Sequence, residues 1–302
     1  MNYWEVSLMD CQIKITDNKA VWKIQAALAL IFLLNPFLGV LSTLFFVFVS
    51  KEKSMAFYLV IILTLFMWCL QSTRSCHLGE PSDWAGNYYY NFHNAAITDT
   101  LTYLFFTTKE YAWQAFNLIG YYLFDGDFLS YANFIVALTY MFTFAAIYKF
   151  WNYIQADPRF LVASLCLFAF VTEVNGICNN LLRQQFAMSM MLYAIIERCT
   201  NGRILYPLLV ISFFTHTMTG FFIPFLFIRL GKKASFRFYI YIVLGFGLLY
   251  ILFTNLSIFS SSSFYAFQRL ATASNAYALK DIIQPSAVYP FLAVTVILYV
   301  KA

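Results

Sequence analysis

The stretch NNLLRQQFAMSMMLYA (Asn179–Ala194) places an arginine and several amides at the start of an otherwise apolar helix. Asn180, Arg183 and Ala187 are spaced at i, i+3 and i+7, so they share one helical face, and Gln184 lies beside them. The small side chain of Ala187 leaves room on that face for a neighbouring helix or a ligand. An arginine in such a segment is a candidate functional residue, and snorkelling of its guanidinium to a membrane interface is the alternative explanation.

The composition of the whole chain identifies the environment of this helix. The 302 residues are 62% hydrophobic and 21% aromatic, and only 11% are charged, whereas soluble domains average about 25% charged residues. We therefore expect an all-α, polytopic integral membrane protein with aromatic belts at the two interfaces. The net charge of +5 concerns topology and does not indicate nucleic-acid binding. The six cysteines form no CxxC or CxxH motif, so no metal or redox site is expected.

Two long apolar stretches are interrupted, which predicts broken helices. Ala20–Ser50 is broken at Asn35-Pro36, and Ile204–Leu230 is broken at 215–220, around His216. Together with the uninterrupted segments they give about ten helical segments, or eight long helices if neither stretch turns back. The uninterrupted segments are Met55–Ser72, Leu129–Phe150, Phe160–Val174, Asn180–Ile196, Phe238–Asn255 and Ala287–Val300.

The chain is expected to form a single transmembrane domain over residues 1–302. Two polar loops interrupt it, at 74–128 and at 257–286. Within the first loop, Thr107–Phe124 mixes polar and aromatic positions and suits a helix that lies on the membrane surface.

Charge bias predicts the orientation of the segments, because Lys and Arg in short loops stay cytoplasmic. If both broken stretches turn back at their breaks, 14 of the 19 Lys and Arg residues lie inside. The five outside are then Arg74, Lys109, Arg183, Arg269 and Lys280.

This topology gathers the candidate chemical groups on the external face. We expect the following residues there or at outer helix ends: Asp83, Tyr88, Glu110, Glu173, Arg183, His216 and Arg269. Arg183 and His216 are the most informative, because a charge inside a hydrophobic segment costs about 2.5–3.5 kcal/mol and needs a partner or a function. Guanidinium binds phosphate oxygens bidentately, and histidine serves as a general base. Hydrogen bonding at a helix break explains His216 equally well, and the acids also fit ordinary loop positions. Trp84, Tyr88–Tyr90 and Phe92 fit either sugar stacking or an interface belt.

Four local patterns then carry a resemblance to a known family. They are Asp83-Trp84 followed by Tyr88 to Tyr90, Lys109-Glu110-Tyr111 at a helix start, Leu182-Arg183-Gln184-Gln185-Phe186-Ala187-Met188-Ser189, and Phe214-Thr215-His216-Thr217. Together they resemble the EpsG-type family of polysaccharide polymerases, which includes Wzy O-antigen and capsule polymerases. The Arg-Gln-Gln-Phe-Ala helix followed by Phe-x-His is the most specific of the four.

The resemblance implies a GT-C-like glycosyltransferase of the bacterial inner membrane, with its active face in the periplasm. Such enzymes transfer a growing glycan from undecaprenyl pyrophosphate to a hydroxyl of an incoming lipid-linked repeat unit, without nucleotide sugar, metal or other cofactor. A chain-length regulator is an expected partner, together with the lipid-linked oligosaccharide and the bilayer.

Site residues follow from the external cluster and the resemblance together. The catalytic candidates are Arg183, His216, Asp83, Glu110 and Glu173, and the substrate-binding candidates are Arg269, Arg74, Tyr88, Tyr111, Asn180 and Gln184.

Three other functions remain open on the sequence. A flippase for the same lipid-linked units would place ionisable residues near mid-membrane, whereas here they gather at one end. A ligase that moves finished glycan to another acceptor is separated from a polymerase only by the family pattern. A purely structural membrane subunit would tolerate replacement of Arg183 by Gln.

Overall fold

A computed structural model describes residues 18–50, 52–73, 87–105, 110–170 and 181–227. Within these ranges the regular structure is entirely helical, as the sequence predicted. Two helices are long and apolar enough to cross a bilayer, Ser54–Ser72 and Phe128–Ile154, and four shorter apolar helices accompany them. The expected segments Phe238–Asn255 and Ala287–Val300 and the loop at 257–286 lie outside the described residues.

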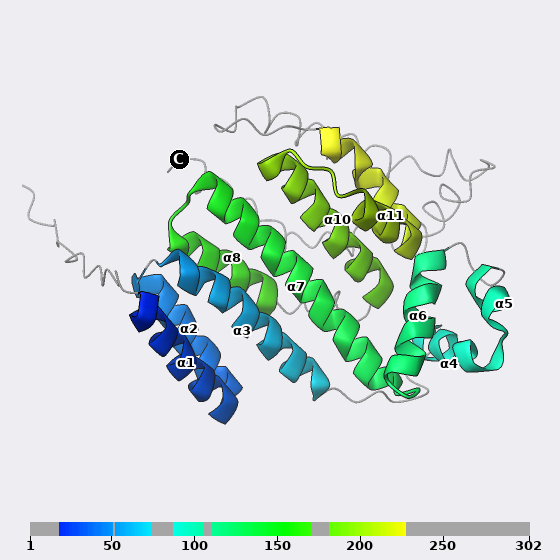
Figure 1. Cartoon of the computed structure of the whole chain (residues 1–302), viewed down its shortest axis with the longest axis horizontal. Coiled ribbons are helices and arrows are strands. Elements are labelled where there is room, and N and C mark those ends of the chain that lie inside the picture. Colours follow the sequence, from blue (N-terminus) through cyan, green and yellow to red (C-terminus); the bar gives the residue numbers. More distant parts are fainter. Residues whose placement is uncertain (1–17, 51, 74–86, 106–109, 171–180, 228–302) are drawn as a thin grey trace, which may run out of the picture. The chain divides into compact units, whose positions relative to one another are not determined.

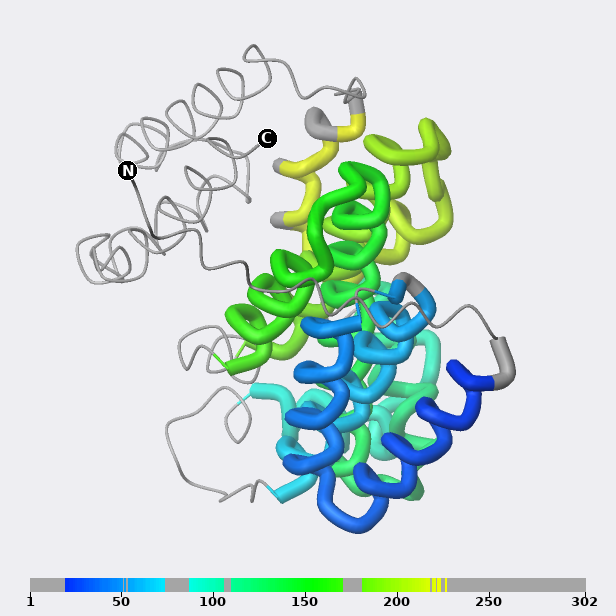
Figure 2. Tube along the Cα trace, turned by 90° about the vertical axis from the view of Figure 1, so that its left-hand side faces the viewer, coloured from blue at the N-terminus to red at the C-terminus, as the bar shows by residue number. Residues whose placement is uncertain are grey.

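The first predicted break is confirmed. Helix α1 (Asn18–Leu34) ends just before helix α2 (Pro36–Ser50) begins, and the Asn35 side chain accepts a hydrogen bond from the Leu38 amide at 3.1 Å. The two helices lie side by side after a tight turn (Figure 2). They approach so closely that a Cβ added at Gly39 would lie 2.4 Å from the Cα of Phe32. Glycine at this position therefore permits the hairpin.

Three longer helices lie beside this hairpin, and α7 (Phe128–Ile154), the middle one, packs against the other two (Figure 1). The other two are α3 (Lys53–Ser72) and α10 (Leu182–Asn201), and α8 (Pro158–Phe170) packs against α2, α3 and α7. Lys149 on α7 forms an ion pair with the buried Glu197 on α10. Asn201 also donates a hydrogen bond to Glu197 at 2.9 Å. This polar link aligns the carboxyl ends of α7 and α10.

The second predicted break is also confirmed, and the chain turns back at it. Helix α11 (Tyr206–Thr215) ends at His216, and a 3₁₀ helix, η2 (Thr217–Phe227), follows. Near the break, Ser212 donates a hydrogen bond to the Ala187 carbonyl in the first half of α10 at 2.8 Å. At the other end, Arg198 near the end of α10 donates to the Leu226 carbonyl at 3.0 Å. Because η2 returns to the end of α10 from which α11 departs, these segments form a hairpin.

The loop predicted at 74–128 contains more structure than the one surface helix expected. Besides α6 (Tyr111–Leu123), it holds α4 (Tyr89–Ile97) and α5 (Thr100–Phe105). The three lie near the start of α7 (Figure 1). Phe92 of α4 is fully buried and stacks on Tyr131 of α7, with ring centroids 4.8 Å apart. Buried aromatic contacts therefore hold this layer, formed by α4, α5 and α6, against α7.

Candidate functional site

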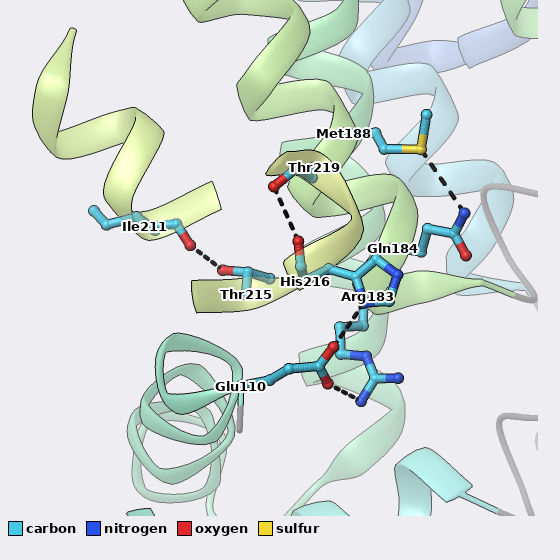
Figure 3. A network of polar contacts seen from close by, with 8 residues as sticks. All are labelled: Glu110, Arg183, Gln184, Met188, Ile211, Thr215, His216 and Thr219. Atoms are coloured by element: carbon cyan, nitrogen blue, oxygen red, sulfur yellow. Dashed lines mark hydrogen bonds and ion pairs between the residues drawn. The ribbon is translucent and has the colours of Figure 1, made fainter. Parts of the chain in front are cut away.

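The candidate site is an ionic cluster of Glu110, Arg183 and His216, three residues predicted from the sequence (Figure 3). One carboxylate oxygen of Glu110, Oε2, forms an ion pair with Nη1 of Arg183. The other oxygen, Oε1, lies 2.7 Å from Nδ1 of His216. Glu110 therefore bridges a cation and an imidazole, although 106 residues of sequence separate it from His216.

Arg183 is positioned by the first turn of α10, where it is the second helical residue. Its side chain is about one-third exposed, and its Nε is buried without a hydrogen-bond partner among the described residues. A buried unsatisfied donor costs about 1–3 kcal/mol. Nη1 is held by Glu110 and about one-third of the side chain remains exposed, so the guanidinium can bind a further acceptor from outside.

His216 is positioned by the break between α11 and η2. Its backbone is extended, with φ −154° and ψ 114°, and its N–H donates to the Ser212 carbonyl at 3.0 Å. The carbonyl of His216 accepts hydrogen bonds from the Thr219 amide at 3.0 Å and the Thr219 hydroxyl at 2.9 Å. Ser212 and Thr219 are both buried, so these hydrogen bonds fix the backbone that carries the imidazole.

Packing around Ala187 brings the three elements together. Ala187 has no exposed surface, and its carbonyl accepts the hydrogen bond from Ser212 of α11. Helix α6 reaches the same region through Phe116, whose ring lies 5.2 Å from that of Phe186 on α10. The expectation that the small Ala187 admits a neighbour is therefore confirmed, and the neighbour is α11.

The cluster lies far from the other ion pair between described residues, Lys149–Glu197. Arg183 and Glu197 are both on α10 and are separated by about 21 Å along its axis at 1.5 Å per residue. One ionic group thus occupies the amino end of α10, and another occupies the carboxyl end.

The structure describes three of the remaining predicted site residues. Tyr111 is partly exposed beside the cluster, and Gln184 contacts the Met188 sulfur at 3.9 Å. Tyr88 is buried and packs edge-on against Trp113, with ring centroids 5.8 Å apart. Asp83, Glu173, Arg74, Asn180 and Arg269 lie outside the described residues, and their roles remain predictions.

The sequence did not reveal a buried polar group on α6, the helix that begins directly after Glu110. Asn117 accepts a hydrogen bond from the Tyr131 hydroxyl at 2.9 Å and donates to Gln114 at 3.4 Å. Burial raises the pKa of Tyr103 to about 12, despite its hydrogen bond with Asn117, so this phenol stays protonated. The signal for the group was the i, i+4, i+7 spacing of Glu110, Gln114 and Asn117 along one face of α6.

No group of three or more His, Cys, Asp or Glu residues suited to a metal ion is present in the described part of the chain. The expectation of a metal-free site stays a prediction.

The described residues thus form the apolar helices of a membrane protein, and these helices carry a partly buried ionic cluster. The model of the EpsG family matches residues 57–302, which include all three residues of the cluster. The chain therefore belongs to the EpsG family, a group of polysaccharide-polymerase type. Comparison with curated proteins and with solved structures gave no match.

Proposed function

We propose that the protein is a GT-C-like glycosyltransferase that polymerises lipid-linked repeat units of a surface polysaccharide, O-antigen or capsule, at the periplasmic face of the bacterial inner membrane. The growing glycan leaves undecaprenyl pyrophosphate and is attacked by a hydroxyl of the incoming unit. The Glu110–Arg183–His216 cluster is the observation that supports this function. It places a guanidinium for a pyrophosphate beside a carboxylate–imidazole pair for a proton.

In the proposed reaction, the bond between the anomeric carbon and the pyrophosphate oxygen breaks as the acceptor oxygen bonds to that carbon. Negative charge then develops on the leaving pyrophosphate, and Arg183 neutralises it. The Arg183 side chain is about one-third exposed, so its guanidinium can contact a pyrophosphate while Nη1 stays paired with Glu110.

His216 takes the acceptor proton in this scheme. Its Nδ1 faces Glu110, so the tautomer with hydrogen on Nδ1 leaves Nε2 as the basic nitrogen. Glu110 then stabilises the imidazolium that forms, as a carboxylate does for a histidine base in hydrolases. Asp83 and Glu173 remain alternative bases under the sequence predictions.

The test is a glycan ladder in the host that carries the gene. The gene is deleted, the surface polysaccharide is resolved by size, and wild type, Arg183→Ala and Arg203→Ala are returned. Arg203 is an exposed arginine in the α10–α11 connection and serves as the matched control. We expect deletion to leave a core with one repeat unit, and only wild type and the Arg203 variant to restore long chains.

Other outcomes would point elsewhere. Loss of even the single repeat unit on deletion would favour a flippase or a ligase. Long chains made by an Arg183→Ala protein present at the wild-type level would remove Arg183 from the mechanism.

A further inference from the structure

Three exposed aromatic rings from three helices meet beside the ionic cluster. Phe105 ends α5, Tyr111 begins α6, and Phe214 precedes the last residue of α11. The Tyr111 ring lies 5.8 Å from that of Phe105 and 5.9 Å from that of Phe214, measured between centroids. Their residues are 56%, 38% and 37% exposed for Phe105, Tyr111 and Phe214, respectively. We call these three rings the aromatic strip.

The aromatic strip is connected to the cluster through the chain itself. Tyr111 directly follows Glu110, and Phe214 comes two residues before His216. Neighbouring aromatics of the same layer, such as Phe92 and Trp113, are instead fully buried. The strip is thus an exposed apolar surface that starts at the charged site.

From Phe214 the apolar surface continues along α11. Tyr206, Val210 and Phe214 follow one another at four-residue spacing, which places them on one helical face, and all three are exposed. This face extends for about 12 Å along the helix axis. On the other side of the strip, the exposed Leu101 lies one turn before Phe105 on α5. Apart from the hydroxyl groups of Tyr111 and Tyr206, the side chains of the strip and of this face offer no hydrogen-bonding groups.

We infer that the aromatic strip and the exposed face of α11 bind the polyprenyl chain of the lipid carrier. This inference rests on the proposed function, since Arg183 is taken to hold the pyrophosphate from which that chain extends. A sugar would require several hydrogen-bonding partners and a flat ring to stack on. The strip offers few hydrogen-bonding partners. The Tyr111 ring is tilted by 45° to that of Phe105 and by 43° to that of Phe214, so the three rings form no flat platform. A flexible hydrocarbon chain follows tilted rings without that requirement.

The experiment measures binding of three probes to the full chain in lipid nanodiscs: undecaprenyl pyrophosphate, farnesyl pyrophosphate and inorganic pyrophosphate. Wild type is compared with a Tyr111→Ala/Phe214→Ala double variant and with Phe45→Ala. Phe45 is a highly exposed aromatic on α2, away from the cluster, and is the matched control. Arg183→Gln reports on the pyrophosphate site independently.

We expect wild type and Phe45→Ala to prefer undecaprenyl over farnesyl pyrophosphate. The double variant should lose about tenfold in that preference, because about ten carbon contacts disappear with the two rings. Its affinity for inorganic pyrophosphate should stay at the wild-type level, whereas Arg183→Gln should weaken all three probes.

Each contrary result has a distinct meaning. Equal binding of the two lipids by wild type, with Arg183-dependent binding of inorganic pyrophosphate, would overturn the inference and leave the proposed function standing. The same holds if the double variant keeps the wild-type preference for undecaprenyl over farnesyl pyrophosphate. Failure of every probe to bind wild type would overturn both proposals.

Discussion

Loss of the ion pair between Glu110 and Arg183 should destabilise the protein by a measurable amount. The Glu110 side chain is 14% exposed and that of Arg183 is 30% exposed. Exposed pairs contribute about 0.2–1 kcal/mol, whereas removing one partner of a fully buried pair costs about 3–5 kcal/mol. This pair is intermediate, so Glu110→Gln should lower the free energy of unfolding by about 1–3 kcal/mol. For a chain of this size that corresponds to a fall in Tm of about 2–6 °C.

A double-mutant cycle isolates the interaction from other effects of each change. Glu110→Gln, Arg183→Gln and the double variant are purified in one detergent, and thermal unfolding is followed by intrinsic fluorescence. We expect the double variant to be more stable than the sum of the single changes predicts, by about 1–3 kcal/mol. The matched cycle pairs Glu110→Gln with Arg203→Gln, which should be additive. Additivity within about 0.5 kcal/mol at Glu110 and Arg183 would refute the ion pair.

Three further predictions concern stability, and thermal unfolding measures all three. Lys149→Met should cost about 2–4 kcal/mol because it leaves the buried Glu197 carboxylate without its cation, and adding Glu197→Gln should recover most of that loss. Gly39→Ala should cost about 1–3 kcal/mol, since its new Cβ would meet the backbone of α1 at 2.4 Å, and an unchanged Tm would contradict this close approach. Asp127 caps α7, and its hydrogen bond with the Ser130 hydroxyl lowers the pKa of its carboxyl, with backbone amides adding to the effect. The cap therefore stabilises the fold above the ordinary aspartate pKa of about 4 and is lost as pH falls below it, so Asp127→Ala should lower the Tm at pH 7 but hardly at acid pH.

The sequence predicted both helix breaks because proline and a run of Thr, His and Gly leave local signatures in apolar stretches. It also placed Arg183 and His216 in apolar segments, where a charge or imidazole demands an explanation. Their shared contact with Glu110 could not be predicted from local patterns. It depends on the return of the chain at His216 and on the packing of α11 against Ala187.

The contacts of Glu110 also could not be predicted from the sequence alone. Its place at a helix start was predicted, and α6 does begin at Tyr111. Its role as the bridge between Arg183 and His216 arises only when α6 packs against α10 and α11. The helices α4 and α5 were missed because stretches of nine and six residues carry too little periodicity. Burial of rings such as Phe92 stabilises them through tertiary contacts.

Reconstitution in liposomes tests whether the Glu110–Arg183–His216 cluster carries out polymerisation. Purified wild type, Glu110→Gln, Arg183→Gln, His216→Gln and Arg203→Gln are placed in liposomes with the host's repeat unit on undecaprenyl pyrophosphate. The readouts are lengthened glycan and released undecaprenyl pyrophosphate. We expect the wild type and the Arg203 variant to produce both, and the three cluster variants to lose at least about a hundredfold in rate while remaining folded. Wild-type rates in the folded Arg183 and His216 variants would show that the cluster does not carry out polymerisation.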